Sequence, residues 1–266
     1  VLIPNTEFKI FNMDTNKYVE MITTYPSKKV HTSFFTDADG DLILPDVLPL
    51  GNYRIEEVAA PFGYVLNENY VEVKVDTDTF YEVDPDTYEA IITVEYENAP
   101  AVGELVIEKK GEVLDAYKGG LFADSEDKEF VYKEGSLASA KFEIYAAEDI
   151  YTADMQTDEN GNRNKYYAEG DLVATVVTGE DGKAKVSDLP LGKYRVVEVE
   201  APYGYVLNKE EQYVTFVYVD DKTPVIKESL TFANDRQKVD LSVAKLDGET
   251  GLPVSGAEFG LYVAED

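Results

Sequence analysis

The chain has 266 residues, of which 44% are hydrophobic, enough to build one to three buried cores. Its formal net charge of −29 argues against nucleic acid and anionic membranes as partners, and no apolar run is long enough to cross a membrane. Cysteine is absent, so the chain has no disulfides. Histidine occurs once, so few side chains are present that could serve in a catalytic triad or a histidine metal site, and no cofactor is predicted.

Short strands are predicted along the whole chain. Segments such as YVEVKV (residues 70–75), ITVEYE (92–97), KYRVVEVEA (193–201) and QYVTFVYV (212–219) alternate with period two and are rich in Val, Ile and Tyr. Turn sequences containing Gly, Asp and Asn separate them. This pattern predicts an all-β chain built from tandem β-sandwich domains.

Internal repetition divides the chain into units. LPLGNYRIEEVAAPFGYVLN (48–67) is repeated as LPLGKYRVVEVEAPYGYVLN (189–208), and GELVIEKKG (103–111) parallels VDLSVAKLDG (239–248). We predict three domains. Residues 1–100 form a repeat without its first strand, 101–237 form a complete repeat, and 238–266 begin a third. The complete repeat carries insertions at about 111–139 and 149–168.

Strand parity places a polar residue at the end of several apolar faces, because successive side chains point to opposite sides of a strand. In the complete repeat these faces are Leu105, Ile107 and Lys109; Tyr194, Val196 and Glu198; and Leu230, Phe232 and Asn234. The related faces elsewhere are Tyr53, Ile55 and Glu57; Ile92, Val94, Tyr96 and Asn98; and Leu241, Val243 and Lys245. The neighbouring Lys110 and Glu56 point outward.

A buried lone Lys or Glu costs several kcal/mol unless it is paired or neutralised. We therefore predict that Lys109, Glu198 and Asn234 meet in one core. Burial lowers a lysine pKa and raises a glutamate pKa, so a neutral amine can attack the Asn carboxamide while the acid moves the proton, leaving an isopeptide bond. A plain buried ion pair, or strand-end residues at the rim of the core, would also satisfy this pattern.

YRVVEVEAPYGY (194–205) resembles the E-box of Gram-positive pilins, and the whole unit resembles the collagen-adhesin B-type (SpaA-like pilin) repeat. The resemblance implies an Ig-like or prealbumin-like sandwich with an autocatalytic Lys–Asn isopeptide bond between its first and last strands. It assigns Lys109 as nucleophile, Asn234 as amide partner and Glu198 as the catalytic proton shuttle. Val199 stands where the family usually has Thr.

The resemblance also assigns parts of sites in the other two units. Glu57 and Asn98 are the glutamate and asparagine of the first unit, and Lys245 is the lysine of the third. Asn98 and Lys245 are therefore unpaired isopeptide candidates. We also consider that Lys245 of one chain links to Asn98 of another.

Other candidate sites carry weaker signals. DADGD (37–41) and DENGN (158–162) have calcium-like spacing but lack the sixth-position Gly and twelfth-position Glu of an EF-hand loop, so we predict turns and no metal site. TYPSKK (24–29) faintly resembles the pilin element whose lysine links subunits. We interpret His31 as a solvated loop residue.

Three functions are considered. The leading hypothesis, which follows from the resemblance, is a structural stalk or pilin-like region at the bacterial cell wall, outside the cell, with neighbouring repeats as partners. The alternative is an adhesin module that binds a host-surface or matrix ligand through the two insertions, where Tyr151, Tyr166 and Tyr167 suit recognition. A turnover enzyme is disfavoured, because the identifiable chemistry is single-turnover and self-directed.

Overall fold

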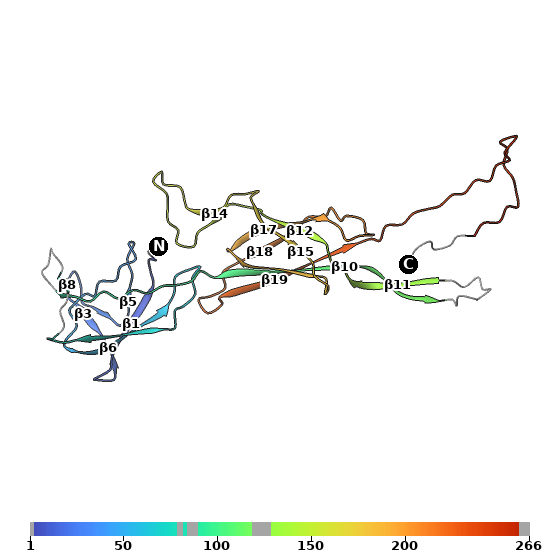
Figure 1. Ribbon diagram of the computed structural model, residues 1–266. Helices are drawn as coiled ribbons and strands as arrows, with labels where there is room; N and C mark the ends of the chain where they lie inside the picture. The colour runs from blue at the N-terminus through green and yellow to red at the C-terminus, as the bar shows by residue number, and fades with distance from the viewer. Residues whose placement is uncertain (1–2, 79–81, 84–89, 119–128, 261–266) are drawn as a thin grey trace.

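The computed structural model describes residues 3–78, 82–83, 90–118 and 129–260, and every helix or strand assigned within them is a β-strand. The strands form two groups that follow one another along an elongated molecule (Figure 1). The prediction of an all-β chain is confirmed. In the described ranges, no helix has the length and apolar character needed to span a membrane.

The first group is built around one five-stranded antiparallel sheet with the order β2-β1-β6-β7, in which β5 also pairs with β1. Its core consists of Ile10, Met21, Phe34 and Tyr53. The strands are β1 (Glu7–Asn12), β2 (Lys17–Tyr18), β3 (Met21–Thr23), β4 (Lys29–His31), β5 (Phe34–Phe35), β6 (Gly51–Ala59), β7 (Tyr70–Val75), β8 (Glu82–Val83) and β9 (Ala90–Ile91).

The second group is a sandwich of two sheets. One sheet has the order β15-β12-β17-β18. In the other sheet, β10 pairs with β11, β16 and β19, and only its pairing with β19 is parallel. The strands are β10 (Val102–Lys118), β11 (Glu129–Ser136), β12 (Lys141–Ala146), β13 (Ile150–Tyr151), β14 (Lys165–Tyr167), β15 (Leu172–Val177), β16 (Lys183–Leu189), β17 (Gly192–Glu200), β18 (Gln212–Phe216) and β19 (Val225–Asn234).

Apolar side chains from both sheets fill the space between them. Leu105 and Ile107 of β10 meet Phe142 of β12, Val196 of β17 and Phe232 of β19, and all five are fully buried. The inward faces predicted from strand parity in this group are therefore confirmed. Each of these side chains removes apolar surface from water, and burial of apolar surface is the dominant favourable contribution to folding.

Two segments predicted as strands are not strands. Residues 92–99 form no ladder with any described residue; the segment instead packs on the first sheet through Tyr96, whose hydroxyl donates to Ile55 O at 2.5 Å. Residues 92–99 form no strand because no neighbouring strand lies beside them among the described residues. The equivalent β19 pairs with β10 along its whole length, whereas no described strand occupies that place beside 92–99. In the described residues, the first group thus consists of this five-stranded sheet, the two-stranded sheets β3-β4 and β8-β9, and the covering segment 92–99.

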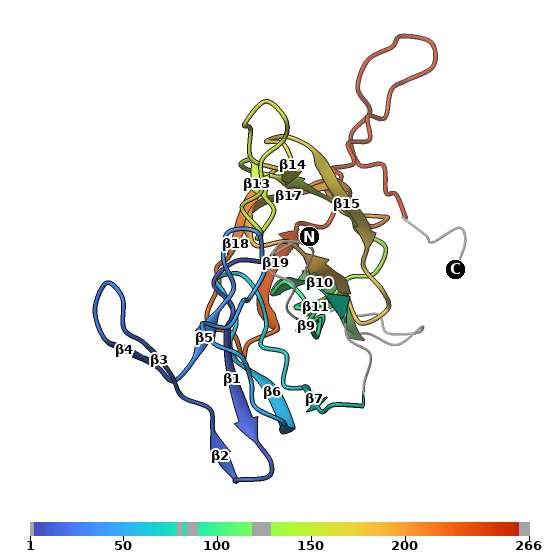
Figure 2. The same cartoon turned by 90° about the vertical axis from the view of Figure 1, so that its left-hand side faces the viewer.

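The second such segment is 239–248 at the start of the predicted third repeat. Leu241 and Val243, predicted to face inward, are 71% and 54% exposed. Residues 238–260 extend away from the second group in both views (Figures 1 and 2) and contain only one isolated bridge, between Leu246 and Pro253. Without a sheet to join among the described residues, alternation alone does not produce a strand.

The two insertions take different forms. Strand β10 continues past the sandwich to Lys118 and pairs with β11, so 111–139 includes a β-ribbon, although residues 119–128 lie outside the described ranges. Strands β13 and β14 make a small hairpin within 149–168. The ribbon and the hairpin leave opposite ends of the sandwich (Figure 1).

Candidate functional site

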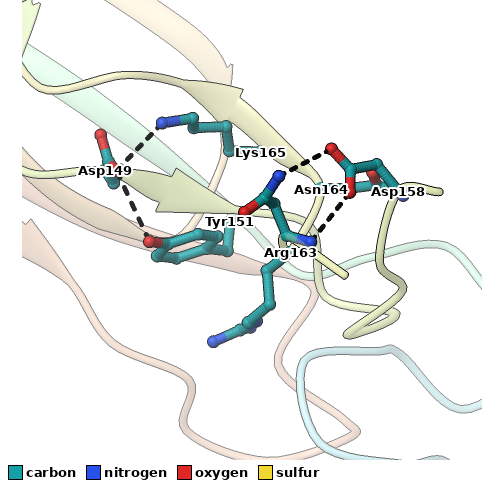
Figure 3. Close-up of a pocket in the computed structure, with 7 residues that line it drawn as sticks. Asp149, Tyr151, Asp158, Arg163, Asn164 and Lys165 are labelled. Atoms are coloured by element: carbon teal, nitrogen blue, oxygen red, sulfur yellow. Dashed lines mark hydrogen bonds and ion pairs between the residues drawn. The ribbon is translucent and has the colours of Figure 1, made fainter. Parts of the chain in front are cut away.

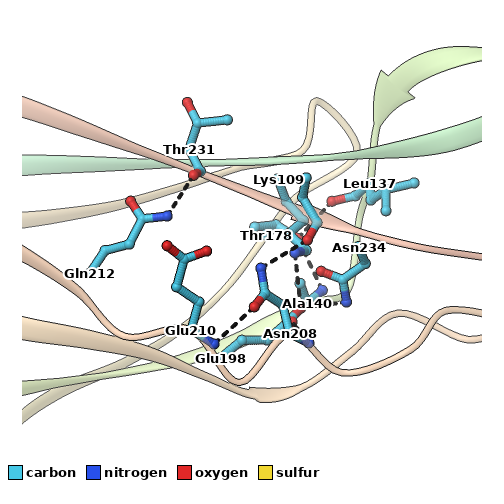
Figure 4. Close-up of polar contacts among 11 residues, drawn as sticks. Lys109, Leu137, Ala140, Thr178, Glu198, Asn208, Glu210, Gln212, Thr231 and Asn234 are labelled. Atoms are coloured by element: carbon cyan, nitrogen blue, oxygen red, sulfur yellow. Dashed lines mark hydrogen bonds and ion pairs between the residues drawn. The ribbon is translucent and has the colours of Figure 1, made fainter.

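Lys109, Glu198 and Asn234 meet inside the second group (Figure 4). Lys109 lies on β10, Glu198 on the facing strand β17 and Asn234 at the end of β19, and their exposures are 0%, 5% and 4%. Lys109 Nζ is 3.3 Å from Glu198 Oε1, and the Asn234 amide nitrogen donates to the same oxygen at 3.1 Å. One carboxylate oxygen therefore contacts both the amine and the carboxamide.

The parallel ladder between β10 and β19 sets this arrangement. Lys109 is level with Phe232, and Asn234 is level with Gly111, so the lysine and asparagine side chains lie on one face, two positions apart. A side chain at Gly111 would press against Leu137, because a Cβ atom there would lie 2.6 Å from Leu137 Cδ1. The packing around the lysine leaves no room for a larger residue at this point.

The surroundings of the lysine are apolar. Its Nζ lies 5.9 Å from the ring centroids of both Phe142 and Phe232. Burial lowers the pKa of Lys109, while the charge of Glu198 opposes that shift. The balance favours an amine that loses its proton more readily than a lysine in water.

Two buried polar atoms of the trio are not hydrogen-bonded. Apart from the ion pair with Glu198, Lys109 Nζ has no hydrogen-bond partner among the described residues, and Asn234 Oδ1 has none either. Native proteins rarely leave buried polar groups in this state, and where they do a chemical role is one explanation.

Asn208 is a site residue that the sequence reasoning missed. Its backbone N–H donates to Glu198 Oε2 at 2.9 Å, and its side-chain amide donates to Ala233 O at 3.0 Å, so it joins the glutamate to the strand carrying Asn234. The signal was present in the repeated GYVLN sequence. The equivalent Asn67 donates to Glu97 O, also at 3.0 Å.

Glu57 and Asn98 form the corresponding pair in the first group. Glu57 is 5% exposed, and its Oε1 accepts a hydrogen bond from Asn98 Nδ2 at 2.7 Å. Burial raises the pKa of Glu57, although the bond from Asn98 opposes the shift. No ion pair to Glu57 occurs within the described residues, and its Oε2 is buried without a partner.

Lys245 lies apart from any such pair. It is exposed, and its Nζ donates only to the neighbouring Leu246 O, at 3.1 Å, within the part of the chain that the structure describes. The structure thus brings together the predicted residues of the second group and the predicted pair of the first, and leaves this lysine in solvent.

The weaker candidates are local structure. Asp37 and Asp158 each close a turn: Asp37 Oδ1 accepts from the N–H of Asp41, and Asp158 Oδ1 from that of Asn162. No cluster of three or more potential metal ligands occurs in the described residues. His31 is half-buried on β4 and bonded to Thr23 Oγ1 at 3.0 Å, so its prediction as a solvated loop residue was wrong. The cross-strand pairing of β3 and β4 holds it there.

Polar residues of the 149–168 insertion line an open hollow of about 580 Å³ (Figure 3). The Arg163 guanidinium lies 4.5 Å from the ring centroid of Tyr151. Asp149 pairs with Lys165 at 3.0 Å. Most charges around the hollow therefore already have partners within the insertion.

Both groups of this all-β chain bury a glutamate beside an asparagine, and the second group adds a buried lysine. These features indicate a class of small β-sandwich domains. The family described as "SpaA: Prealbumin-like fold domain" matches residues 2–88 and 130–229, and the chain belongs to it. The two matched ranges fall in the two groups of strands. The predicted resemblance to SpaA-like repeats is thereby confirmed.

Individual relatives are more distant. The trypsin-resistant surface T6 protein of Streptococcus pyogenes serotype M6 is 27% identical over 147 residues, which are 54% of this chain and 25% of that protein. The chain thus spans about a quarter of that relative's length.

Similar solved structures include the TIE protein of Bacillus anthracis (24% identity, 88% of this chain and 31% of that chain, TM-score 0.47). A minor pilin of Streptococcus agalactiae is 16% identical over 92% of this chain and 88% of that chain, with a TM-score of 0.33. The shaft pilin SpaA of Lactobacillus rhamnosus GG is 14% identical over 90% of each chain, with a TM-score of 0.31.

Proposed function

We propose that this chain is a structural, pilin-like stalk segment of a Gram-positive surface protein, located outside the cell at the wall. In its second repeat, residues 101–237, an isopeptide bond joins Lys109 to Asn234. Membership of the SpaA family and the similarity to a streptococcal surface protein support the stalk role. The contacts of the buried trio support the bond.

The reaction begins with proton transfer inside the trio. In the dry core the lysine gives a proton to Glu198, which leaves a neutral amine and a neutral acid. The Lys109 nitrogen attacks Cγ of Asn234, and the C–Nδ2 bond breaks. Glu198 carries the proton from the amine to Nδ2, which leaves as ammonia, so atoms and charge balance.

The observation that carries this proposal is the position of one oxygen atom. Glu198 Oε1 lies 3.3 Å from the attacking nitrogen and 3.1 Å from the leaving nitrogen, so the same atom can accept the proton and deliver it. Fixed placement of this kind is worth on the order of 7–11 kcal/mol of barrier in favourable intramolecular reactions. The bond would also remove a buried charge from the core.

The bond suits a segment under tension. Closing the loop from residue 109 to residue 234 is worth roughly 5 kcal/mol in the chain-entropy model. More importantly, β10 enters the repeat and β19 leaves it, so a covalent link between them carries a pull directly from one end of the repeat to the other.

Intact mass tests the bond. The wild-type chain should be lighter than its sequence by one ammonia, about 17 Da, and Glu198→Ala should restore the full mass. Glu200→Ala is the matched control, because this exposed glutamate lies on the same strand β17 and should leave the deficit in place. A folded wild-type chain at its full mass would refute the bond.

The first repeat, 1–100, would use Glu57 and Asn98 in the same way with a lysine strand beside them, and Lys245 would be the lysine of the third, 238–266. A link from Lys245 of one chain to Asn98 of another would produce covalent ladders on a denaturing gel. Monomer alone would exclude that link.

The alternative proposal is an adhesin module in which the two insertions bind a host-surface or matrix ligand. The polar hollow beside Tyr151 is the observation that favours it. Deleting both insertions should leave the fold and the mass deficit of a stalk unchanged. Loss of adhesion to immobilised matrix protein would support the binding module.

A further inference from the structure

The loop that follows β6, the first-group counterpart of the E-box strand β17, contacts the second group. We call residues 60–66 the E-box loop and residues 218–223, between β18 and β19, the acidic turn. Asp221 Oδ2 accepts from Ala60 N at 3.2 Å, and Asp221 O accepts from Leu66 N at 2.7 Å. Tyr218 donates its hydroxyl to Tyr64 O at 3.1 Å.

Packing supports these polar contacts. The Phe62 ring lies 4.8 Å from the Tyr218 ring, and Tyr64 is buried, which raises its pKa to about 12. Next to the loop, the buried Ala101 donates to Gly63 O at 2.9 Å. One aspartate thus binds both ends of the loop while a tyrosine covers its middle.

The same loop recurs in the second group, at residues 201–207, with the same turn bond: Tyr64 N donates to Pro61 O and Tyr205 N to Pro202 O, both at 3.1 Å. Val65 N bonds to Ala99 O, as Val206 N bonds to Asp235 O, both at 2.9 Å. There, however, Tyr203, the counterpart of Phe62, is fully exposed. The amides of Ala201 and Leu207, the counterparts of Ala60 and Leu66, have no partner among the described residues. The loop shape therefore belongs to the repeat and does not need the contact to form.

We propose that the E-box loop is the surface by which one repeat docks on the next. The partner that fits it is a turn presenting an aspartate carboxylate and a tyrosine hydroxyl, and Asp221 is the residue that specifies the contact. The carboxylate gives the loop a charged acceptor, and hydrogen bonds to charged acceptors are about twice as strong as neutral ones. Docking holds consecutive repeats in one orientation, independently of any bond between Lys109 and Asn234.

The contact also reaches the candidate site of the first group. Asp221 adds to the elevation of the Glu57 pKa, behind the larger effect of burial. The E-box loop begins three residues after Glu57, so the docked turn supports the strand end that carries this glutamate.

Hydrogen exchange on the 266-residue chain tests the docking. Ala60 and Leu66 amides should be protected, while Ala201 and Leu207 should exchange at least about tenfold faster, because protection follows the opening of each hydrogen bond. Asp221→Ala removes the carboxylate that accepts from Ala60 N and should bring Ala60 to the faster rate. Leu66 keeps its acceptor, the backbone carbonyl of residue 221, and should follow only through the loss of docking. Asp221→Asn, which keeps an acceptor atom, should have a smaller effect. Equal rates at both loops in the wild type would overturn the proposal.

Spin-label distances test the fixed orientation. The chain has no cysteine, so Lys17→Cys and Glu180→Cys, two exposed positions on different groups, can be labelled alone. The wild-type background should give one narrow distance distribution, and Asp221→Ala a broad one. Asp78→Ala is the matched control, since Asp78 is an exposed aspartate that follows β7, as Asp221 follows β18, and should leave the distribution narrow. An unchanged distribution in a folded Asp221→Ala chain would overturn the role of Asp221.

Discussion

Mechanical extension of the second repeat gives the sharpest prediction. Force enters at the start of β10 and leaves at the end of β19, and these neighbouring strands are parallel from Val102 to Gly111. With the bond in place, the load passes from Lys109 to Asn234, and the chain between them is not stretched. In Glu198→Ala only the hydrogen bonds of the ladder resist, so the repeat should unfold.

The size of the effect follows from chain geometry. About 125 residues lie between the two linked positions, and at 3.3–3.6 Å each they add about 400 Å of extension when released. Single-molecule force spectroscopy should show this step in Glu198→Ala and not in the wild type. The first group, which unfolds in both chains, provides an internal reference.

Glu200→Ala is the control for the force experiment and should behave as the wild type. A step of about 400 Å in the wild-type chain, at the force seen in Glu198→Ala, would refute the reasoning. It would mean that the buried trio is an ordinary ion pair and that the ladder alone carries the load.

Two further predictions concern stability. Since burial raises the pKa of Glu57, the folded state binds more protons than the unfolded state between the ordinary glutamate pKa and the raised one, so this group's stabilising contribution is lost as pH rises through the raised pKa. Glu57→Gln should therefore stabilise the first group by on the order of 1 kcal/mol at pH 7 and should not stabilise it at pH 3. Urea unfolding at both pH values measures the change in stability. Glu56 is the outward neighbour of Glu57, and an equal gain from Glu56→Gln would contradict this reasoning. Gly103→Ala should destabilise the second group by about 1–3 kcal/mol, because a Cβ at Gly103 would lie 2.4 Å from the Phe216 ring; an unchanged calorimetric transition would count against this packing.

Local pattern was sufficient to identify the candidate site. Side chains alternate on a strand whatever its partner, so the inward positions of Lys109, Glu198 and Asn234 could be predicted from spacing alone. The cost of burying single charges then predicted that they meet. The same reasoning selected Glu57 over Glu56.

Strand pairing was the part that local pattern did not predict. Residues 92–99 and 239–248 alternate as well as β19 and β10 do, yet they form no ladder with a described residue. A strand is stable only when its backbone groups find a neighbour, and for β19 that neighbour is β10, far earlier in the chain. Conversely, β10 continues to Lys118, into the predicted insertion, because β11 is there to pair with it.

The sequence by itself determined the repeats, the β class and the polar residues that enter the core, because each of these depends on composition and on spacing within one segment. Only the tertiary structure decided that one oxygen of Glu198 touches both Lys109 and Asn234, that Asn208 holds the other oxygen, and that Asp221 binds the loop after β6. These contacts join positions far apart in the chain, and no local pattern specifies which loop will lie beside which turn.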